Sequence, residues 1–350
     1  MRKKIQSSYQ EVPGTGILPA EYQLLEPNNQ EEPSVVIAFI KKRCTLLFIL
    51  PLSLFFFNIC SAQTTDSFSI KKRTWAMAGG QAAFYAGSLL ALNQAWYANY
   101  PSAPLHSFDD SREWLQVDKT GHAWTAYQLS RGTYGMWKWA TQNEKKAALL
   151  SGISSLGYMT VIEFLDGKSA EWGWSWSDIG ANFTGTGLFL SQQLAWKEQR
   201  IYLKWSFHPG SYSEPDLKAR ANQLFGKSWY EQMLKDYNTQ TYWLSANIHS
   251  FFKDSKIPKW LNLSIGYGAD GLWGGEENIA KNAAGQVTFD RTDIKRIRQF
   301  YLAPDIDFTR IPTKKKWLKT VFYCLNSLKM PAPALMLNSS GKLKGYFLYF

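Results

Sequence analysis

The sequence predicts an α+β protein, in which a bundle of about four apolar, small-residue-rich helices precedes a strand-rich C-terminal region. Long stretches with few charges and many small residues occupy the chain up to about residue 200. Beyond that point apolar and polar residues alternate, which is typical of strands. With 350 residues, 45% of them hydrophobic, the chain can form one large domain or two modest ones. We expect a helical envelope domain over 63–200 and a β-rich region over 201–350.

The N-terminal segment has the features of an export signal. Residues 1–34 are polar without an apolar period, and we expect a disordered extension there. A basic run, KKR, precedes the apolar stretch Thr45–Phe57, and small residues lead up to Gln63. This pattern predicts a signal peptide over 35–62, with an uncleaved anchor as the alternative.

The three cysteines limit the covalent chemistry of the mature chain. Ile59 precedes Cys60, whereas a small residue precedes a lipidated cysteine, so we expect no lipidation at Cys60. Removal of the signal peptide would leave Cys324 alone. The mature chain would then have no internal disulfide, and packing would have to stabilise it.

The first helix is expected within Trp75–Ala98, a stretch without charged residues. Its small residues allow helices to approach closely. It is long enough to span a bilayer, but Gln81 and the pair Asn93-Gln94 weaken that interpretation, and whether it spans stays open. Pro101 and Pro104 follow this helix and end it.

Three further helices are expected near 119–139, 144–166 and 178–197. The last begins after the run GWSWSD, where Ser177 or Asp178 suits the N-cap. We expect the tryptophans of this region to lie at an apolar–polar boundary, closing over His122 and Glu163. They are Trp172, Trp174 and Trp176. The glycine pair Gly185 and Gly187 predicts close helix packing.

The C-terminal region contains three alternating stretches, at 201–208, 260–268 and 297–311, which we expect to form strands. An amphipathic helix is expected at 314–329. The chain ends in KGYFLYF, and a terminal aromatic strand is compatible with an outer-membrane barrel. Few strands are visible, so the barrel is an alternative interpretation.

Polar residues gather at the ends of the three later helices. Asp118, Lys119 and His122 share one face of the second helix. Glu163 and Asp166 end the third, and Asp178 and Asn182 begin the fourth. Ionisable groups beside apolar helix faces are costly unless they are paired. We therefore expect these side chains to form one cluster.

Three interpretations of the cluster remain open. It can be a hydrogen-bonded network that fixes how the helices dock. It can perform acid/base chemistry, with His122 as acid or base and a carboxylate orienting it. It can hold a divalent metal through His122, Asp118 and Glu163. No Walker loop, G-x-S-x-G, H-E-x-x-H or paired-cysteine zinc motif is present, so the sequence names no cofactor and leaves open whether the protein is an enzyme.

Charge and aromatic content indicate the class of partner. The net charge is +11, and 16% of the residues are aromatic, with 16 tryptophans. Tryptophan and tyrosine suit membrane interfaces, and no nucleic-acid-binding signature accompanies the basic runs. We expect membrane lipid or an anionic envelope polymer as partner, with a tryptophan-rich core and a solvated basic face as the alternative. The oligomeric state is not indicated.

These motifs resemble a known family over about residues 115–195. D-K-x-x-H at 118–122, EFLDG at 163–167, GWSWSD at 173–178 and N-x-x-G at 182–185 are similar to the YfiM-like predicted periplasmic lipoprotein family of unknown function. The spacing is also similar, more weakly, to VanZ-like membrane proteins. The resemblance implies that the cluster residues are motif positions, but it implies no reaction. This chain departs from the family in lacking a usable lipobox and in adding about 150 C-terminal residues.

We therefore expect an exported, membrane-associated cell-envelope protein that binds or scaffolds. The alternative is an envelope hydrolase or transferase that uses the cluster on a lipid or lipid-linked substrate. We expect the periplasm or an outer-membrane-associated location, with the inner membrane as the alternative.

Overall fold

The computed structural model describes residues 67–94, 101–282 and 284–350. They belong to one unit that runs from Phe56 to Phe350. The expected extension over 1–34 and signal peptide over 35–62 lie outside the described residues. Long helices come first, and a six-stranded antiparallel sheet with short helices follows, so the predicted α+β class is confirmed.

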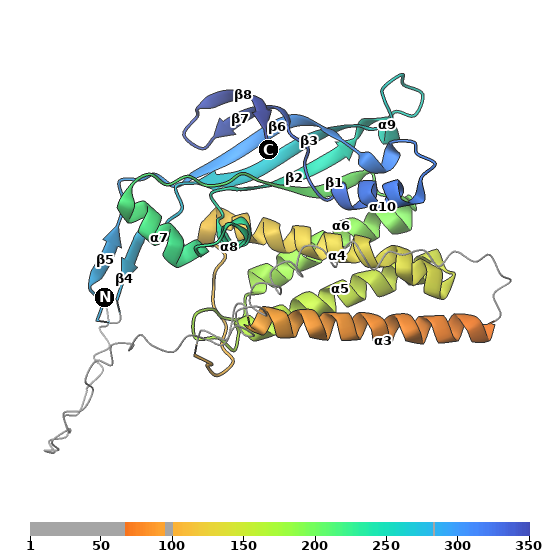
Figure 1. Cartoon of the computed structure of the whole chain (residues 1–350), viewed down its shortest axis with the longest axis horizontal. Helices are drawn as coiled ribbons and strands as arrows, with labels where there is room; N and C mark the ends of the chain where they lie inside the picture. Colours follow the sequence, from red (N-terminus) through yellow and green to blue (C-terminus); the bar gives the residue numbers. More distant parts are fainter. Residues whose placement is uncertain (1–66, 95–100, 283) are drawn as a thin grey trace, which may run out of the picture. The chain divides into compact units, whose positions relative to one another are not determined.

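Four long helices form the N-terminal part. They are α3 (Ser67–Leu92), α4 (Val117–Thr141), α5 (Glu144–Asp166) and α6 (Trp176–Ala195). The helix α4 contacts each of the other three. It lies between the sheet and α5 (Figure 1). The first helix begins at Ser67 rather than at Trp75, because the polar and basic residues before Trp75 continue its first turns.

The start of α6 differs from the expected one. Ser175, not Ser177 or Asp178, is the N-cap: its backbone is extended, and its Oγ accepts the Asp178 backbone N–H at 3.0 Å. Trp176 is already helical and is 71% exposed. Trp172 and Trp174 are half-buried. The proposed closure of tryptophans over His122 therefore does not extend to Trp176, and stays a prediction for the other two.

The sheet has the strand order β1-β2-β3-β6-β7-β8, and all neighbours are antiparallel. Its strands are β1 (Ile201–Phe207), β2 (Gln240–Asn247), β3 (Leu261–Asp270), β6 (Ile297–Ile306), β7 (Ala332–Asn338) and β8 (Leu343–Tyr349). A separate hairpin joins β4 (Ile279–Lys281) and β5 (Val287–Asp290). The three expected strands correspond to β1, β3 and β6, and the terminal aromatic strand to β8. The sequence analysis missed β2 and β7.

Short helices complete the C-terminal part. They are α7 (Pro215–Phe225), α8 (Trp229–Lys235), α9 (Ile248–Phe251) and α10 (Lys316–Leu325), with the 3-10 turn η3 (Phe308–Arg310). Another 3-10 turn, η2 (Glu113–Gln116), directly precedes α4. The helix α10 ends at Leu325 rather than at 329. The chain turns back there because the Asn326 side chain accepts the Phe308 N–H, and Leu328 then bridges to Trp205.

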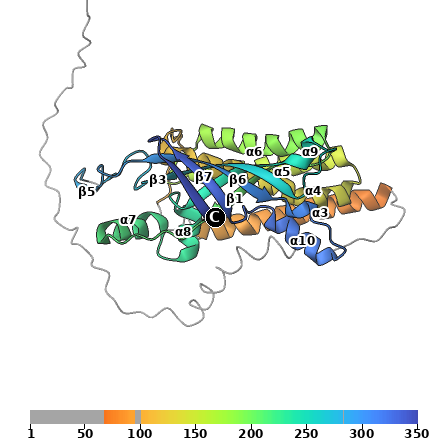
Figure 2. The ribbon, with the colours of Figure 1, turned by 90° about the horizontal axis from the view of Figure 1, so that it is seen from above.

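The sheet has one face against α4 and one polar, buried face. Toward α4, the Trp124 and Trp205 rings lie 5.7 Å apart, and Gln128 donates to the Leu203 carbonyl at 2.7 Å. On the other face, Asp305 accepts from Lys204 at 2.8 Å. Seen from above, the strands cross over the helices (Figure 2). These contacts hold α4, which carries three of the seven residues of the predicted cluster, in place.

Candidate functional site

Lys119 lies at the centre of the polar cluster. Its Nζ is 2.6 Å from Asp110 Oδ2, 2.9 Å from Asp118 Oδ2 and 2.8 Å from Asp178 Oδ1. These carboxylates come from the loop before α4, from α4 itself and from α6. Because all four side chains are at most 13% exposed, the ammonium ties three separate segments together.

Asp110 and Ser175 belong to the cluster, although the sequence did not indicate them. Asp110 Oδ1 accepts from Ser175 Oγ at 2.6 Å and from Ser177 Oγ at 2.7 Å. Ser175 thus caps α6 and anchors the loop before α4 at the same time. No local pattern marks Asp110, since only the fold brings residue 110 beside residue 175.

His122 lies between two carboxyl groups. Its Nδ1 is 3.3 Å from Glu163 Oε1, and its Nε2 is 3.8 Å from Asp178 Oδ2. The helices α4 and α6 can approach this closely because position 185 is glycine: a Cβ there would lie 1.9 Å from the Ala123 carbonyl oxygen. The expected close packing is confirmed at Gly185, while a Cβ at Gly187 would meet nothing within 4 Å.

Burial dominates the electrostatics of the carboxyl groups. Burial, with repulsion from Asp178 and Asp166, raises the pKa of Glu163 to about 9. Burial also raises the pKa of Asp118 to about 6, although Lys119 favours its charged form. Glu163 therefore carries a proton at neutral pH when no cation is bound.

Two groups keep their charge. Burial would raise the pKa of Asp110, but hydrogen bonds from Lys119 and the two serines lower it to about 2. Burial likewise disfavours the charge of Lys119, but the carboxylates around it hold its pKa above the usual range. Asp110 and Lys119 therefore form a permanent ion pair.

Several buried polar atoms in this cluster have no hydrogen-bond partner among the described residues. Both carboxyl oxygens of Glu163, both amide atoms of Asn182 and Nδ1 of His122 are in this state. Glu163 is fully buried and Asn182 is 2% exposed. An unsatisfied buried polar atom costs about 1–3 kcal/mol, so a structural network alone leaves this concentration unexplained.

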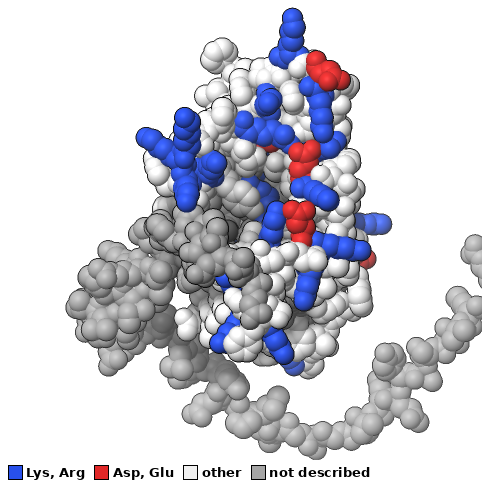
Figure 3. Space-filling view, turned by 90° about the vertical axis from the view of Figure 1, so that its right-hand side faces the viewer, with Lys and Arg blue, Asp and Glu red and all other residues white. Residues whose placement is uncertain are grey.

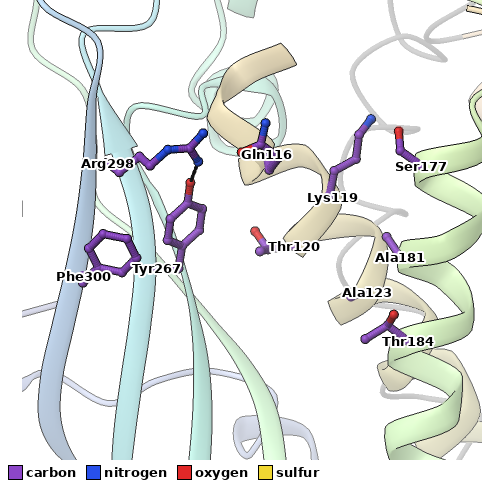
Figure 4. A pocket seen from close by; sticks show the side chains of 10 residues that line it. All are labelled: Gln116, Lys119, Thr120, Ala123, Ser177, Ala181, Thr184, Tyr267, Arg298 and Phe300. Carbon is purple, nitrogen blue, oxygen red and sulfur yellow. Dashed lines mark hydrogen bonds between the residues drawn. The ribbon is translucent and has the colours of Figure 1, made fainter. Parts of the chain in front are cut away.

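A pocket of about 520 Å³ opens beside Lys119. It lies between α4 and α6 on one side and β3 and β6 on the other, with Tyr267, Arg298 and Phe300 facing Lys119 and Ser177 across it (Figure 4). At its rim, Trp114, Leu115 and Gln116 have left-handed backbones. Such strain in consecutive non-glycine residues is typical of functional sites.

The structure brings together Asp118, Lys119, His122, Glu163 and Asp178. Asp166, half-buried at the end of α5, acts on Glu163 through its charge, and Asn182 lies buried one turn after Asp178. His122, Glu163 and Asp178 form a trio whose ligand atoms lie within 4.8 Å of one another. Asp178 therefore replaces the expected Asp118 beside His122, because the Asp118 carboxylate turns to Lys119.

Comparison with known proteins identifies the segment that carries this cluster. Residues 107–192 match the family described as predicted periplasmic lipoprotein (DUF2279). The expected family resemblance is thereby confirmed for this segment. The DUF2279 segment contains α4, α5 and most of α6, and with them every residue of the cluster. No curated protein and no solved structure matches the chain. The similarity to VanZ-like proteins stays a prediction.

Proposed function

We propose that this is an exported cell-envelope protein that associates with a membrane through the outward face of its helices and that binds or scaffolds there. The observation that carries the proposal is an inverted burial pattern. A surface helix of a water-soluble protein turns its apolar residues inward and its polar residues outward. The outer helices of this protein bury polar residues and expose large apolar ones.

The pattern is clearest on α5. Its buried positions include Ser151, Ser155 and Glu163, whereas Ile153 is 63% exposed and Phe164 46% exposed. Between Lys146 and Asp166 the only charged residue, Glu163, points inward. This face would expose a continuous apolar stripe to water, which is typical of a membrane or partner contact.

The helices α6 and α3 also bury polar residues and expose large apolar ones. On α6 the buried residues include Asn182, Thr186 and Gln192, while Phe183 is 60% exposed. On α3 the buried residues are Met77 and Gln81, and Trp75 and Leu90 lie outside. Uncharged apolar surface therefore extends over three neighbouring helices.

Among the described residues, α5 is the helix that is long and apolar enough to cross a membrane, by length and composition alone. Whether the stretch Trp75–Ala98 spans a bilayer, which the sequence leaves open, stays open, since its last residues lie outside the described ones.

Basic residues at one end of the bundle favour an anionic lipid surface. The starts of α3 and α5 and the end of α4 meet there, as the Arg73 guanidinium over the Trp139 ring indicates. Lys and Arg dominate this end (Figure 3). The helix α10 adds Lys315, Lys316 and Lys319 beside Trp317, which is 62% exposed. Aromatic and basic residues together suit the headgroup region.

Vesicle flotation tests the proposal. The mature chain, purified in detergent, is mixed with vesicles of phosphatidylcholine, with or without phosphatidylglycerol. We expect it to float with both and more completely with the anionic vesicles. Ile153→Lys and Phe183→Lys should reduce flotation at least several-fold, because each places a charge on the apolar face.

Leu234→Lys is the matched control, since Leu234 is 52% exposed on α8, away from this face. It should float like the wild type. A chain that stays monodisperse without detergent and ignores both kinds of vesicle would refute membrane association.

A second candidate function is an envelope hydrolase or transferase. It is favoured by the pocket beside Lys119 and by the position of His122 between two carboxyl groups, because acid/base chemistry requires a histidine beside a carboxylate that orients it. Thermal melts of His122→Ala and Glu163→Gln test it. A large loss of stability in both would support a structural network, whereas unchanged or raised melting points would support groups kept for function.

A further inference from the structure

We propose that His122, Glu163 and Asp178 bind a divalent transition-metal cation, for which Zn²⁺ is the natural first probe. The inference goes beyond membrane association and does not depend on it. It rests on geometry, on buried atoms without partners, and on the way Lys119 divides the cluster.

The three side chains converge from three helices. One ligand atom of each lies within 4.8 Å of the ligand atoms of the other two, and the closest pair, His122 Nδ1 and Glu163 Oε1, is 3.3 Å apart. An imidazole and two carboxylates form a common donor set for divalent transition metals. Small side-chain adjustments would bring such donors to coordination distance.

Several atoms of the cluster lack hydrogen-bond partners. Among the described residues, six such buried side-chain atoms belong to four side chains of the cluster, those of Asp118, His122, Glu163 and Asn182. Asp178 is not counted among them, because its Oδ1 lies 2.8 Å from the Lys119 ammonium. The Glu163 carboxyl group, fully buried and aimed at His122, is the strongest case. A cation would coordinate oxygens that make no hydrogen bond of good geometry within the described residues.

Lys119 decides which acidic trio remains available. Asp110, Asp118 and Asp178 also converge within 4.8 Å, but the Lys119 ammonium already lies 2.6–2.9 Å from an oxygen of each. Asp178 gives Oδ1 to Lys119 and turns Oδ2 toward His122. Lys119 therefore takes the place that a cation would have among the three aspartates. It also orients Asp178 toward His122, as outer-shell partners of a metal site commonly orient the ligands.

The surroundings suit a bound ion. His122 is 23% exposed in its side chain, which leaves a path from the surface, while the other two side chains are at most 9% exposed. Asn182 lies one helical turn beyond Asp178 and offers a buried amide oxygen. The imidazole favours Zn²⁺ over Mg²⁺, which prefers oxygen ligands and keeps its water.

Metal binding to the mature chain, purified in detergent without a histidine tag, tests the inference. After dialysis against Zn²⁺, elemental analysis should find one equivalent per chain, and Zn²⁺ should raise the melting temperature. His122→Asn and Glu163→Gln should each weaken binding at least tenfold. Mg²⁺ at the same concentration should leave the melting temperature unchanged.

His106→Asn and Glu171→Gln are the matched controls, because both residues are exposed in loops outside the cluster. They should bind Zn²⁺ like the wild type. Equal binding by the wild type and His122→Asn, or no bound Zn²⁺ at all, would overturn the inference. X-ray absorption of the Zn²⁺-loaded wild type tests the inference without any variant, so it remains informative even if both site variants fail to fold. The absence of imidazole from the coordination shell of the ion would overturn the inference.

Failure of this inference is separable from failure of membrane association. A chain that floats with vesicles but binds no Zn²⁺ keeps the proposed function and loses the metal site. A chain that binds Zn²⁺ through His122 but does not bind vesicles keeps the metal site and loses the proposed membrane association.

Discussion

Single residues determine how the cluster is divided. Asp178 is shared, since one carboxylate oxygen contacts Lys119 and the other faces His122. The ion-pair half and the histidine half of the cluster are therefore coupled through one side chain. Removing a partner from a buried ion pair is costly because it leaves an uncompensated charge, so substitutions at Lys119 are expected to disturb both halves.

Gly185→Ala is expected to destabilise the protein by about 2 kcal/mol, because the new methyl group would overlap the Ala123 carbonyl oxygen and push α4 and α6 apart. Gly187→Ala, two residues along the same helix, should be neutral or stabilise by about 0.5 kcal/mol, since nothing lies within 4 Å of its Cβ. Chemical denaturation of the two variants beside the wild type measures this. Equal losses in both would mean that helix propensity, and not the close contact, governs position 185.

At the scale of the element, the start of α6 shows how one residue can fix both a helix and a loop. Ser175 caps the helix and donates to Asp110, whereas Ser177 donates to Asp110 and contacts Ser175 Oγ at 3.0 Å without capping the helix. The cap therefore orders the loop that delivers the third carboxylate to Lys119.

Ser175→Ala should cost about 1–2 kcal/mol of stability, because it removes the cap and one bond to Asp110. Ser177→Ala should cost less, about 1 kcal/mol, since it removes the hydrogen bonds of Ser177 to Asp110 and to Ser175 Oγ but leaves the cap in place. Thermal melts of both variants provide the comparison. A larger loss of stability in Ser177→Ala than in Ser175→Ala would mean that Ser177, as the sequence indicated, is the N-cap of α6.

The polar face of the sheet carries its own pH dependence. Burial lowers the pKa of Lys329 to about 8, with Lys204 adding to the effect and Asp305 opposing it. Between about pH 8 and the unfolded pKa near 10.4, the unfolded chain holds a proton that the folded chain has released. Stability contributed by this residue must therefore rise with pH across that window.

Lys329→Met removes this titration, while Asp305 keeps its partner Lys204 at 2.8 Å. The free energy of unfolding of the wild type, measured relative to this variant, should increase between pH 8 and pH 10 and be flat between pH 6 and pH 7. Urea denaturation at four pH values provides the measurement. A difference that does not change with pH would mean that Lys329 keeps its proton in the fold.

At the scale of the whole molecule, helices and sheet share α4. Val117 and Tyr127 of α4 are fully buried, and Arg131 donates to the Tyr323 carbonyl at 2.7 Å. The change from helices to strands near residue 200 is thus a change of element type within one packed unit. The expected division into domains at 200 and 201 stays a prediction.

A fragment covering residues 63–200 should not melt cooperatively, because the face of α4 that packs on β1 and β2 would be exposed. Adding the fragment 201–350 should restore a cooperative transition. Circular dichroism in the same detergent detects both outcomes. A sharp melt of the first fragment alone would show that the helical part is an independent domain.

Local patterns in the sequence predicted much of this fold. Uncharged stretches rich in small residues located the long helices, since helix formation depends on neighbours along the chain. Alternation located β1, β3 and β6. It did not locate β2, because the buried face of that strand carries the polar residues Thr241, Ser245 and Asn247, while Leu244 on the other face is exposed. The short helices α7 and α8 give little helical periodicity.

What the sequence determined by itself is therefore local: the α+β class, the positions of the helices, and the three helical edges that carry ionisable residues. Only the tertiary structure decided which of these residues meet. Asp110 and Ser175 joined the cluster, and Asp178 took the place expected for Asp118, because partners 65 positions apart are chosen by packing and not by spacing. The tertiary structure likewise decided that α5 and α6 bury polar residues and expose apolar ones, because both pack on α4 with their polar sides. A helix alone does not specify which of its faces is buried.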